Sequence, residues 1–281
     1  MGLGRSFGRV LECRRKLHAM RRLRFLTHRH RAPSTNRALG LLLAFNAGAV
    51  NAGGFLVLHM YTSHMTGFAS QFADGLVLGN TRLLLNALGA ILAFLAGAAV
   101  CAILVNWGRQ HRLRSVYAVP LLLEAALMFP FGLMGAITLT WPTPFAVPLT
   151  VLLLSFIMGL QNAVGSKTSG GSVRTTHMTG NITDVGMELG KLLYWNRHAT
   201  PAHAMVRHNR RRMQMAGGLI GMFVLGGIVG ALGFSYIGFV CVVPLAALLL
   251  AVSIPPLMED VPRSRPLQKL LAVFRRRPRC P

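Results

Sequence analysis

Residues 61–67 read Tyr61-Thr62-Ser63-His64-Met65-Thr66-Gly67, and residues 174–180 read Arg174-Thr175-Thr176-His177-Met178-Thr179-Gly180. Both stretches have the form Thr-x-His-Met-Thr-Gly, and they lie 113 residues apart in a chain of 281 residues. Each one interrupts a long apolar region with hydroxyl side chains, a histidine and a glycine. A polar interruption repeated at that distance predicts two structural copies of one unit.

The apolar regions around the two motifs predict an all-α integral membrane protein. The chain is 53% hydrophobic and 13% charged, whereas an average soluble domain is about a quarter charged. Several apolar runs exceed the roughly 18 residues that mark a membrane span. We expect about six transmembrane helices, near residues 38–60, 83–106, 117–139, 148–164, 213–234 and 238–256.

The basic residues predict the orientation of these spans. The chain has 30 Lys and Arg against 7 acidic residues, and 27 of the 30 fall in residues 1–37, 107–115, 191–212 and 257–281. With the N-terminus inside, six crossings bring all four segments to the cytoplasmic side, as the positive-inside rule requires. Arg82 is the exception. We therefore expect a multi-pass membrane protein with both termini cytoplasmic.

The basic charge also bears on the expected partners. Because topology accounts for the formal net charge of +23, nucleic acid is not expected as a partner. Besides the lipid bilayer itself, anionic lipids are candidate partners of the basic tails.

These features divide the chain into four parts. Residues 1–37 and 257–281 are basic cytoplasmic tails, while residues 38–141 and 142–256 are the two transmembrane repeats. The first tail is expected to be disordered, or to reflect a start codon assigned too early with Met20 as the true start. A short amphipathic surface helix is the alternative.

The segment after each motif is expected to leave the membrane on the side where it entered. Residues 68–79 would reach only about 18 Å as a helix, which is too short for a span. A re-entrant or interfacial Thr-Gly element is therefore expected in each copy. Each half then contains three crossings. Because this number is odd, the second half has the opposite orientation in the membrane from the first, and the two motifs lie towards opposite faces. Many secondary transporters are built from such inverted repeats.

The repeat extends upstream, because Val50-Asn51-Ala52-x-Gly54 is similar to Gln161-Asn162-Ala163-x-Gly165 at an offset of 111 residues. Together with Ala49–Phe55, Met65–Gly67, Gly159–Ala163 and Thr175–Asp184, these stretches give a resemblance to a known family. Over roughly residues 38–256 the chain resembles the YoaK-like, DUF1275 (UPF0700) family of bacterial multi-pass membrane proteins.

The resemblance implies an integral inner-membrane protein and brings no established substrate or catalytic residue. Two positions depart from it. Relatives usually have Asp where Asn51 stands, and Thr-Gly-Asn where the first copy reads Thr66-Gly67-Phe68. If that Asp handles protons or ions in relatives, the role is in doubt for this chain.

The motifs are the candidate binding site. In each copy the second Thr and the Gly can begin a short helix, with Thr66 or Thr179 as N-cap, and such a helix start attracts anions. The alternative is a tight turn at the membrane surface. His64 and His177 either gate protons or hydrogen-bond a neighbouring loop. The candidate substrate-binding residues are Asn51, His64, Thr66, Gly67, Asn162, Thr176, His177, Thr179 and Gly180.

Three acids are candidates for proton coupling. Glu124 lies in the middle of a span, where a charge is costly, although it can instead be a neutral structural acid in a kinked helix between Pro120 and Pro130. Asp184 and Asp74 follow the two motifs. Glu188 and Lys191 are expected to pair with each other one turn apart.

No enzyme, cofactor or metal is expected. The sequence contains no Gly-x-Ser-x-Gly, His-Glu-x-x-His or phosphate-loop pattern, so no common catalytic motif is present. Its four cysteines lack metal-type spacing, and no third ligand accompanies the two motif histidines. The leading hypothesis is a secondary transporter of a small solute, with an anion as one candidate, working by alternating access at the repeat interface. The alternative is a non-transporting membrane scaffold or a subunit of a membrane complex.

Overall fold

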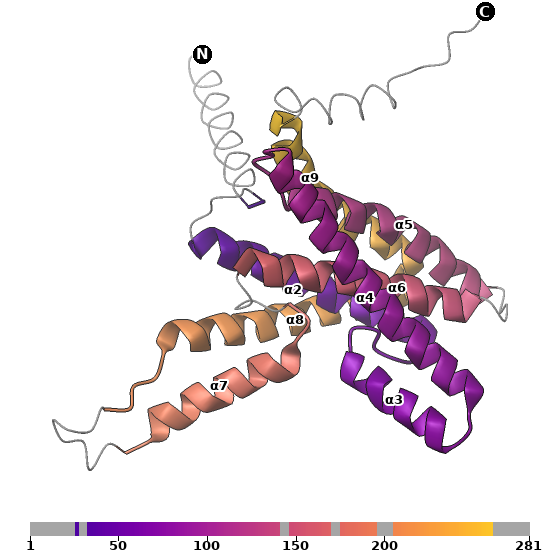
Figure 1. Cartoon of the computed structure of the whole chain (residues 1–281), viewed down its shortest axis with the longest axis horizontal. Helices are drawn as coiled ribbons and strands as arrows, with labels where there is room; N and C mark the ends of the chain where they lie inside the picture. Colours follow the sequence, from indigo (N-terminus) through magenta and orange to yellow (C-terminus); the bar gives the residue numbers. More distant parts are fainter. Residues whose placement is uncertain (1–25, 28–32, 141–145, 170–174, 196–204, 261–281) are drawn as a thin grey trace, which may run out of the picture.

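The structure, a computed structural model, describes residues 26–27, 33–140, 146–169, 175–195 and 205–260, and these residues form helices and no strands (Figure 1). Both basic tails lie almost entirely outside the described residues, as does Arg174. The helices are α2 (Pro33–Leu58), α3 (Met65–Val77), α4 (Thr81–Gln110), α5 (Ala118–Thr140), α6 (Ala146–Ser169), α7 (Met178–Leu193), α8 (Arg210–Tyr236), the 3₁₀ helix η1 (Gly238–Cys241) and α9 (Val242–Asp260).

Six of these helices are long and apolar enough to cross a membrane, namely α2, α4, α5, α6, α8 and the unit of η1 with α9. Their positions confirm the six spans predicted from the sequence. Helices α3 and α7 are shorter, with 13 and 16 residues, and each begins inside a copy of the motif. At about 1.5 Å per residue, both are too short to cross a membrane.

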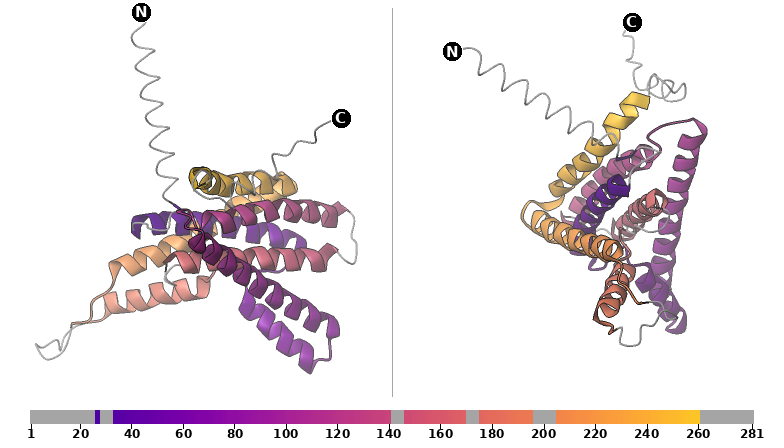
Figure 2. Two further views of the ribbon diagram at one scale, coloured as in Figure 1. Left: turned by 45° about the horizontal axis from the view of Figure 1, so that its top comes forward. Right: turned by 90° about the vertical axis from the view of Figure 1, so that its left-hand side faces the viewer.

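The two halves of the chain pack by one plan, with α2, α3, α4 and α5 corresponding to α6, α7, α8 and α9. Helix α2 packs on α8 as α6 packs on α4, and α3 lies along α4 as α7 lies along α8 (Figure 2). The buried share of each span follows the same pairing: 67% and 61% for α2 and α6, 22% for both α4 and α8, and 39% for both α5 and α9. The opposite orientation of the halves in a membrane stays a prediction.

Close backbone contact fixes the crossing of α2 and α8. A Cβ atom added to Gly48 would lie 2.0 Å from the carbonyl oxygen of Phe223, and one added to Gly226 would lie 2.0 Å from that of Phe45. No side chain fits in either gap. Small residues allow helices in lipid to approach this closely, where dispersion contacts drive their association.

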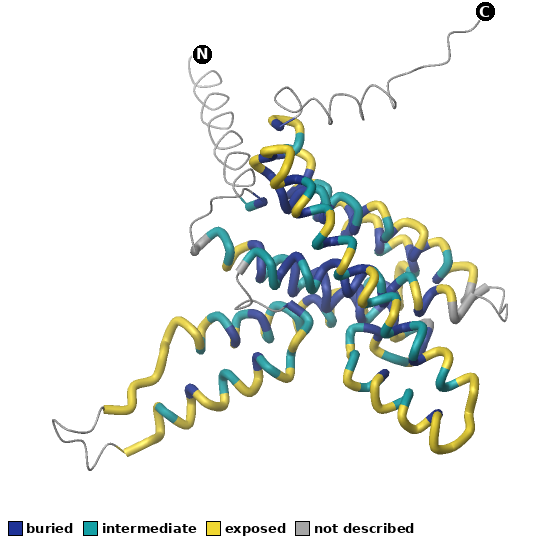
Figure 3. The backbone as a smooth tube through the Cα atoms, viewed as in Figure 1, coloured by how far each residue is buried: buried dark blue, intermediate teal, exposed yellow. Residues whose placement is uncertain are grey.

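The crossing of α4 and α6 has the same chemistry. A Cβ atom on Gly97 would lie 2.1 Å from the carbonyl oxygen of Phe156, and one on Gly159 would lie 2.1 Å from that of Phe94. All four helices therefore present a Phe-x-x-Gly sequence at their crossing. Buried residues gather in the middle of the bundle, where α6 packs on both α2 and α4, while the outer ends of α3 and α7 are exposed (Figure 3).

Candidate functional site between the two motifs

The chain enters the first motif through an abrupt end to α2. His59 has a φ of 51°, in the left-handed region that commonly terminates helices but that residues with a side chain seldom adopt. Its backbone N–H donates to the carbonyl of Phe55, at 2.8 Å. A turn follows, in which the N–H of His64 donates to the carbonyl of Tyr61 at 3.1 Å. This turn connects the end of α2 to α3, which begins at Met65.

The residue that precedes each short helix is the histidine of the motif. The N-cap positions belong to His64 and His177, so the prediction that Thr66 or Thr179 caps the helix is wrong. The helix begins directly after the histidine, whose ψ is 74° in the first copy and 64° in the second, and each threonine is already the second helical residue.

The motif glycines make room for these histidines. A Cβ atom on Gly67 would lie 2.9 Å from Nδ1 of His64, and one on Gly180 would lie 2.3 Å from Nδ1 of His177. Each imidazole therefore folds back over the first turn of its own helix. Any larger residue at the glycine position would push the ring away.

The two copies of the motif share one burial pattern. Thr62 and Thr175 are fully buried, the next residue is half-buried in both copies, and the histidine after it is exposed. The pattern continues position by position to Phe68 and Asn181, which are both buried. Equivalent residues of the two copies therefore occupy equivalent surroundings.

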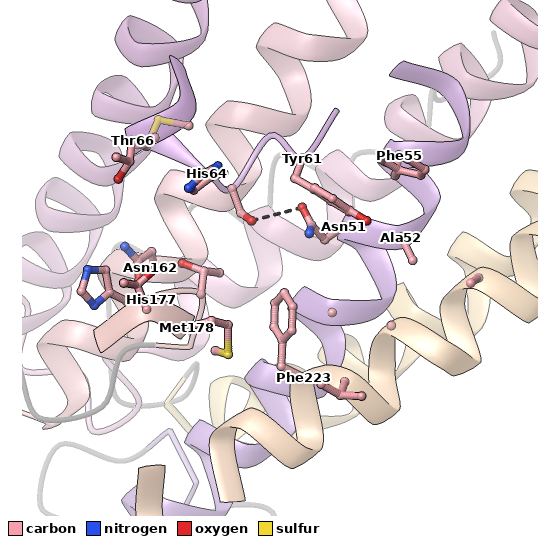
Figure 4. A pocket seen from close by; sticks show the side chains of 18 of the residues that line it. Asn51, Ala52, Phe55, Tyr61, His64, Thr66, Asn162, His177, Met178 and Phe223 are labelled. Atoms are coloured by element: carbon pink, nitrogen blue, oxygen red, sulfur yellow. Dashed lines mark hydrogen bonds between the residues drawn. The ribbon is translucent and has the colours of Figure 1, made fainter. Parts of the chain in front are cut away.

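Both copies line a single pocket of about 810 Å³ (Figure 4). The starts of α3 and α7 meet at this pocket, and the two helices diverge from it towards opposite sides of the view (Figure 1). The polar residues that line it are Asn51, Tyr61, Ser63, His64, Thr66, Asn162, Thr176, His177 and Thr179. Seven of the nine predicted binding residues are among them, and the other two are the glycines beneath the histidines.

The rest of the lining is apolar and was missed by sequence reasoning. Phe55, Phe94 and Phe223 contribute aromatic rings, and Phe55 stacks on Tyr61 with ring centroids 4.7 Å apart. Phe94 and Phe223 belong to the Phe-x-x-Gly crossings, so the repeated Phe-x-x-Gly pattern was the available signal. No Asp, Glu, Lys or Arg is among the described residues that line the pocket.

The two pocket asparagines differ in their hydrogen bonds. Ser63 Oγ donates to Asn51 Oδ1 at 3.1 Å (Figure 4). The oxygen of the equivalent Asn162 is buried and meets no partner in the part of the chain that the structure describes. An unpaired buried acceptor is costly, so the two asparagines are not in equivalent surroundings.

The three candidate acids lie outside the pocket lining. Glu124 is fully buried, and Nδ2 of Asn46 donates to its Oε1 at 3.3 Å. Asp184 forms an ion pair with Arg212, at 2.9 Å, where α7 lies along α8. Asp74 is exposed on α3. Glu124 is thus the candidate that is enclosed by the spans.

The predicted pairing of Glu188 with Lys191 is confirmed, at 2.8 Å. The hydrogen bond from Lys191 and a second one from the backbone N–H of Asn209 lower the pKa of Glu188. This carboxylate ties α7 to the residue that caps α8, since Asn209 Oδ1 accepts from the N–H of Arg212. Among the described residues, no cluster of three His, Cys, Asp or Glu is arranged to hold a metal ion.

Comparison with known proteins identifies the family. Residues 39–254 match the family described as "Protein of unknown function (DUF1275)". The chain is also similar to the UPF0700 transmembrane protein YoaK of Bacillus subtilis (strain 168), at 26% identity over 159 residues, which cover 56% of this chain and 68% of that protein. No solved structure matches the chain.

Proposed function

We propose that this chain, a multi-pass bacterial membrane protein that belongs to the DUF1275 family, is a secondary transporter of a small anionic solute. The observation that supports the proposal most directly is the single pocket lined by both copies of the motif. A motif that served only as a surface turn would have no reason to face its own repeat across a cavity.

The chemistry of the pocket favours an anion with an apolar body. The starts of α3 and α7 bring unpaired backbone N–H groups and two partial positive charges to the pocket. The imidazoles of His64 and His177 lie over these helix starts, and protonation of either ring would add to the attraction. The rings of Phe55, Phe94 and Phe223 supply an apolar wall. A carboxylate or phosphate with a small hydrophobic group suits this combination.

The arrangement of the helices supports alternating access at the interface of two inverted repeats. Broken elements that meet at a central site are typical of secondary transporters with inverted repeats. In this chain α3 and α7 are the short elements, and the crossings of α2 with α8 and of α4 with α6 are alike. Rocking about these two crossings would open the pocket to one face and then to the other.

Ligand-dependent thermal stabilisation of the purified full-length protein tests the binding site. Acetate, benzoate and inorganic phosphate are the probes, and we expect a saturable rise in Tm with at least one of them. Gly180→Leu should weaken that response about tenfold or more, because its side chain displaces His177. Gly186→Leu on the same helix is the matched control, since a Cβ atom there meets nothing within 4 Å. A wild-type protein that responds to none of the probes, or a Gly180→Leu variant that responds as wild type does, would overturn the anion site.

The proposed orientation has a separate test. With cytoplasmic termini, the turn after α4 lies inside the cell, and a reporter fused after Trp107 should read as cytoplasmic. An external reading would contradict the inverted arrangement and, with it, the proposed mechanism.

A further inference from the structure

A second group of polar side chains lies buried behind the pocket, on helices α2, α5 and α6. Asn46, Glu124 and Gln161 are all fully buried. Asn46 Nδ2 donates to Glu124 Oε1, and Gln161 Nε2 donates to the carbonyl of Leu43, both at 3.3 Å. Leu43 and Asn46 are three residues apart on α2 and therefore lie on one face, one above the other. The amide of Gln161 thus lies within about one helical turn of the pair formed by Asn46 and Glu124.

Each of the three side chains has an oxygen atom left over. Asn46 Oδ1, Glu124 Oε2 and Gln161 Oε1 are buried, and none of them meets a hydrogen-bond donor in the described residues. A lone buried acceptor is unfavourable, and an unpaired buried carboxylate is far more so. In the part of the chain that the structure describes, Glu124 forms no ion pair with a basic residue. One carboxylate and two carboxamide oxygens are the donor set that a hard cation prefers.

We propose that Asn46, Glu124 and Gln161 form a binding site for a monovalent cation, either a sodium ion or a proton. The cation neutralises Glu124, and the carboxamide oxygens complete its surroundings. The neighbouring helices supply few other charges. Helix α4 adds the buried thiol of Cys101, and the half-buried Lys167 lies near the end of α6.

The remaining charged groups on the packed helices stand at helix ends. These groups are Arg37 on α2, Arg82 and Arg109 on α4, Arg210, Arg211 and Arg212 on α8, and Glu259 and Asp260 on α9. Asp260 accepts a hydrogen bond from the backbone N–H of Ser115 at 2.8 Å. In its fully buried position, Glu124 therefore remains the group whose charge a cation would balance.

The same two helices connect this cation site to the pocket. Gln161 is followed directly by Asn162, which lines the pocket, and Asn46 precedes the pocket residues Gly48 and Asn51 on α2. A cation that draws α2 and α6 towards α5 must therefore move Asn51 and Asn162. This coupling rests on the proposed transport function, whereas cation binding itself does not.

Thermal unfolding of the purified full-length protein, with no solute added, tests the cation site. In one arm sodium chloride replaces choline chloride at constant ionic strength and pH. In the other arm the pH is lowered in choline chloride alone. A sodium site should give a saturable rise in Tm of roughly 5–10 °C at a hundredfold excess over Kd. A proton site should give a comparable rise as the pH falls, with no response to sodium.

Substitutions then assign the response to the three residues. Glu124→Gln should abolish the response of Tm to the cation. Gln161→Met leaves the carboxylate of Glu124 in place, and it should weaken sodium binding about tenfold or shift the pH response. Glu259→Gln, at an exposed acid at the end of α9, is the control and should respond as wild type does. A wild-type Tm that is insensitive to both sodium and pH overturns the proposal. A Glu124→Gln variant that keeps the wild-type response does the same.

The pocket variant Gly180→Leu separates this proposal from the transport function. It should lose stabilisation by the anion probes and keep the full response to the cation. If no anion probe binds even the wild-type protein but the cation response remains, the transport proposal fails and the cation site stands. If the anion response is present and the cation response is absent, the cation site fails and the transport proposal stands.

Discussion

In the first copy of the motif Ser63 donates a hydrogen bond to Asn51, whereas in the second copy the oxygen of the equivalent Asn162 meets no partner among the described residues. The copies otherwise agree in burial class at every position from Thr62 and Thr175 to Val77 and Gly190. At the two helix crossings, the distances from an added Cβ atom to the facing carbonyl oxygen agree within 0.1 Å. The hydrogen bonds at the motif loops therefore differ between the halves, whereas the crossings do not. A transporter made of inverted repeats needs such a difference, because in any one conformation its two halves face different sides.

The largest expected effect concerns a buried position where the copies differ in residue type. Phe68 is 3% exposed and packs in the main core, while its equivalent in the second copy is the buried Asn181. Phe68→Asn, which makes the copies alike, should lower the free energy of unfolding by about 3–5 kcal/mol, because it removes a core aromatic ring and buries an amide. Chemical unfolding in detergent measures the change. Phe68→Leu is the control and should cost less. If Phe68→Asn were nearly neutral, the copies would be interchangeable.

The crossings should respond alike in the two halves. Gly48→Ala and Gly159→Ala place a methyl group about 2 Å from a facing carbonyl oxygen, so each should cost about 1–3 kcal/mol through overpacking. Gly217→Ala on α8 is the matched control, since a Cβ atom there meets nothing within 4 Å, and it should be neutral or slightly stabilising. Thermal unfolding in detergent gives all three values. A large cost at one of the two crossings alone would show that the halves are not equivalent.

Much of the fold was predictable, because a helix that crosses lipid needs a long uninterrupted run of apolar residues, and such runs are visible in the sequence. The six spans and the two short elements follow from that rule and from the repeated motif. The crossings were harder to predict. The sequence shows small residues such as Gly97 and Gly159, but which glycine meets which carbonyl depends on helix rotation that hydropathy does not encode. The Phe-x-x-Gly pattern on four spans is present in the sequence, but the pattern alone does not say which helices cross.

The candidate site was predictable in its residues but not in its position. The exact repeat identified His64, His177 and their neighbours, yet the charge count placed the motifs towards opposite faces. A shared pocket is compatible with motifs that lie towards opposite faces, because α3 and α7 start at the pocket and then diverge. Patterns in the sequence do not reveal this geometry. The N-cap was assigned to Thr66 by propensity, whereas Gly67 lets the ring of His64 lie over the helix start.

The hydrogen bond that separates the two motifs can be tested directly. Asn51→Ala should cost about 1 kcal/mol in the free energy of unfolding, because it leaves the hydroxyl of Ser63 without its acceptor. Asn162→Ala should cost close to nothing, because its oxygen has no described partner to lose. A double-mutant cycle isolates each pair, and we expect coupling for Asn51 with Ser63 and none for Asn162 with Thr176. Equal coupling in both cycles would mean that the copies do not differ in solution.

The smallest expected effect is a pH dependence confined to the second half. Glu188 holds Lys191 and the N–H of Asn209, whereas its equivalent in the first half is Gly75, packed against the backbone of Leu84. Because these hydrogen bonds lower the pKa of Glu188, its contribution to stability is complete above the ordinary carboxylate range. That contribution is lost as the pH falls through the lowered pKa.

Glu188→Gln should therefore have a lower Tm than wild type at neutral pH, and the two curves should converge in acid, below about pH 4. Thermal unfolding across this pH range makes the measurement, and Lys191→Gln should reproduce part of the change because it removes the larger of the two causes. A difference between Glu188→Gln and wild type that stays constant with pH would mean that the carboxylate acts only by its shape. The tie between α7 and α8 would then match the contact of α3 with α4, where the carbonyl of Gly75 accepts from the N–H of Asn80 at 3.0 Å without a titratable group, and this contrast between the halves would disappear.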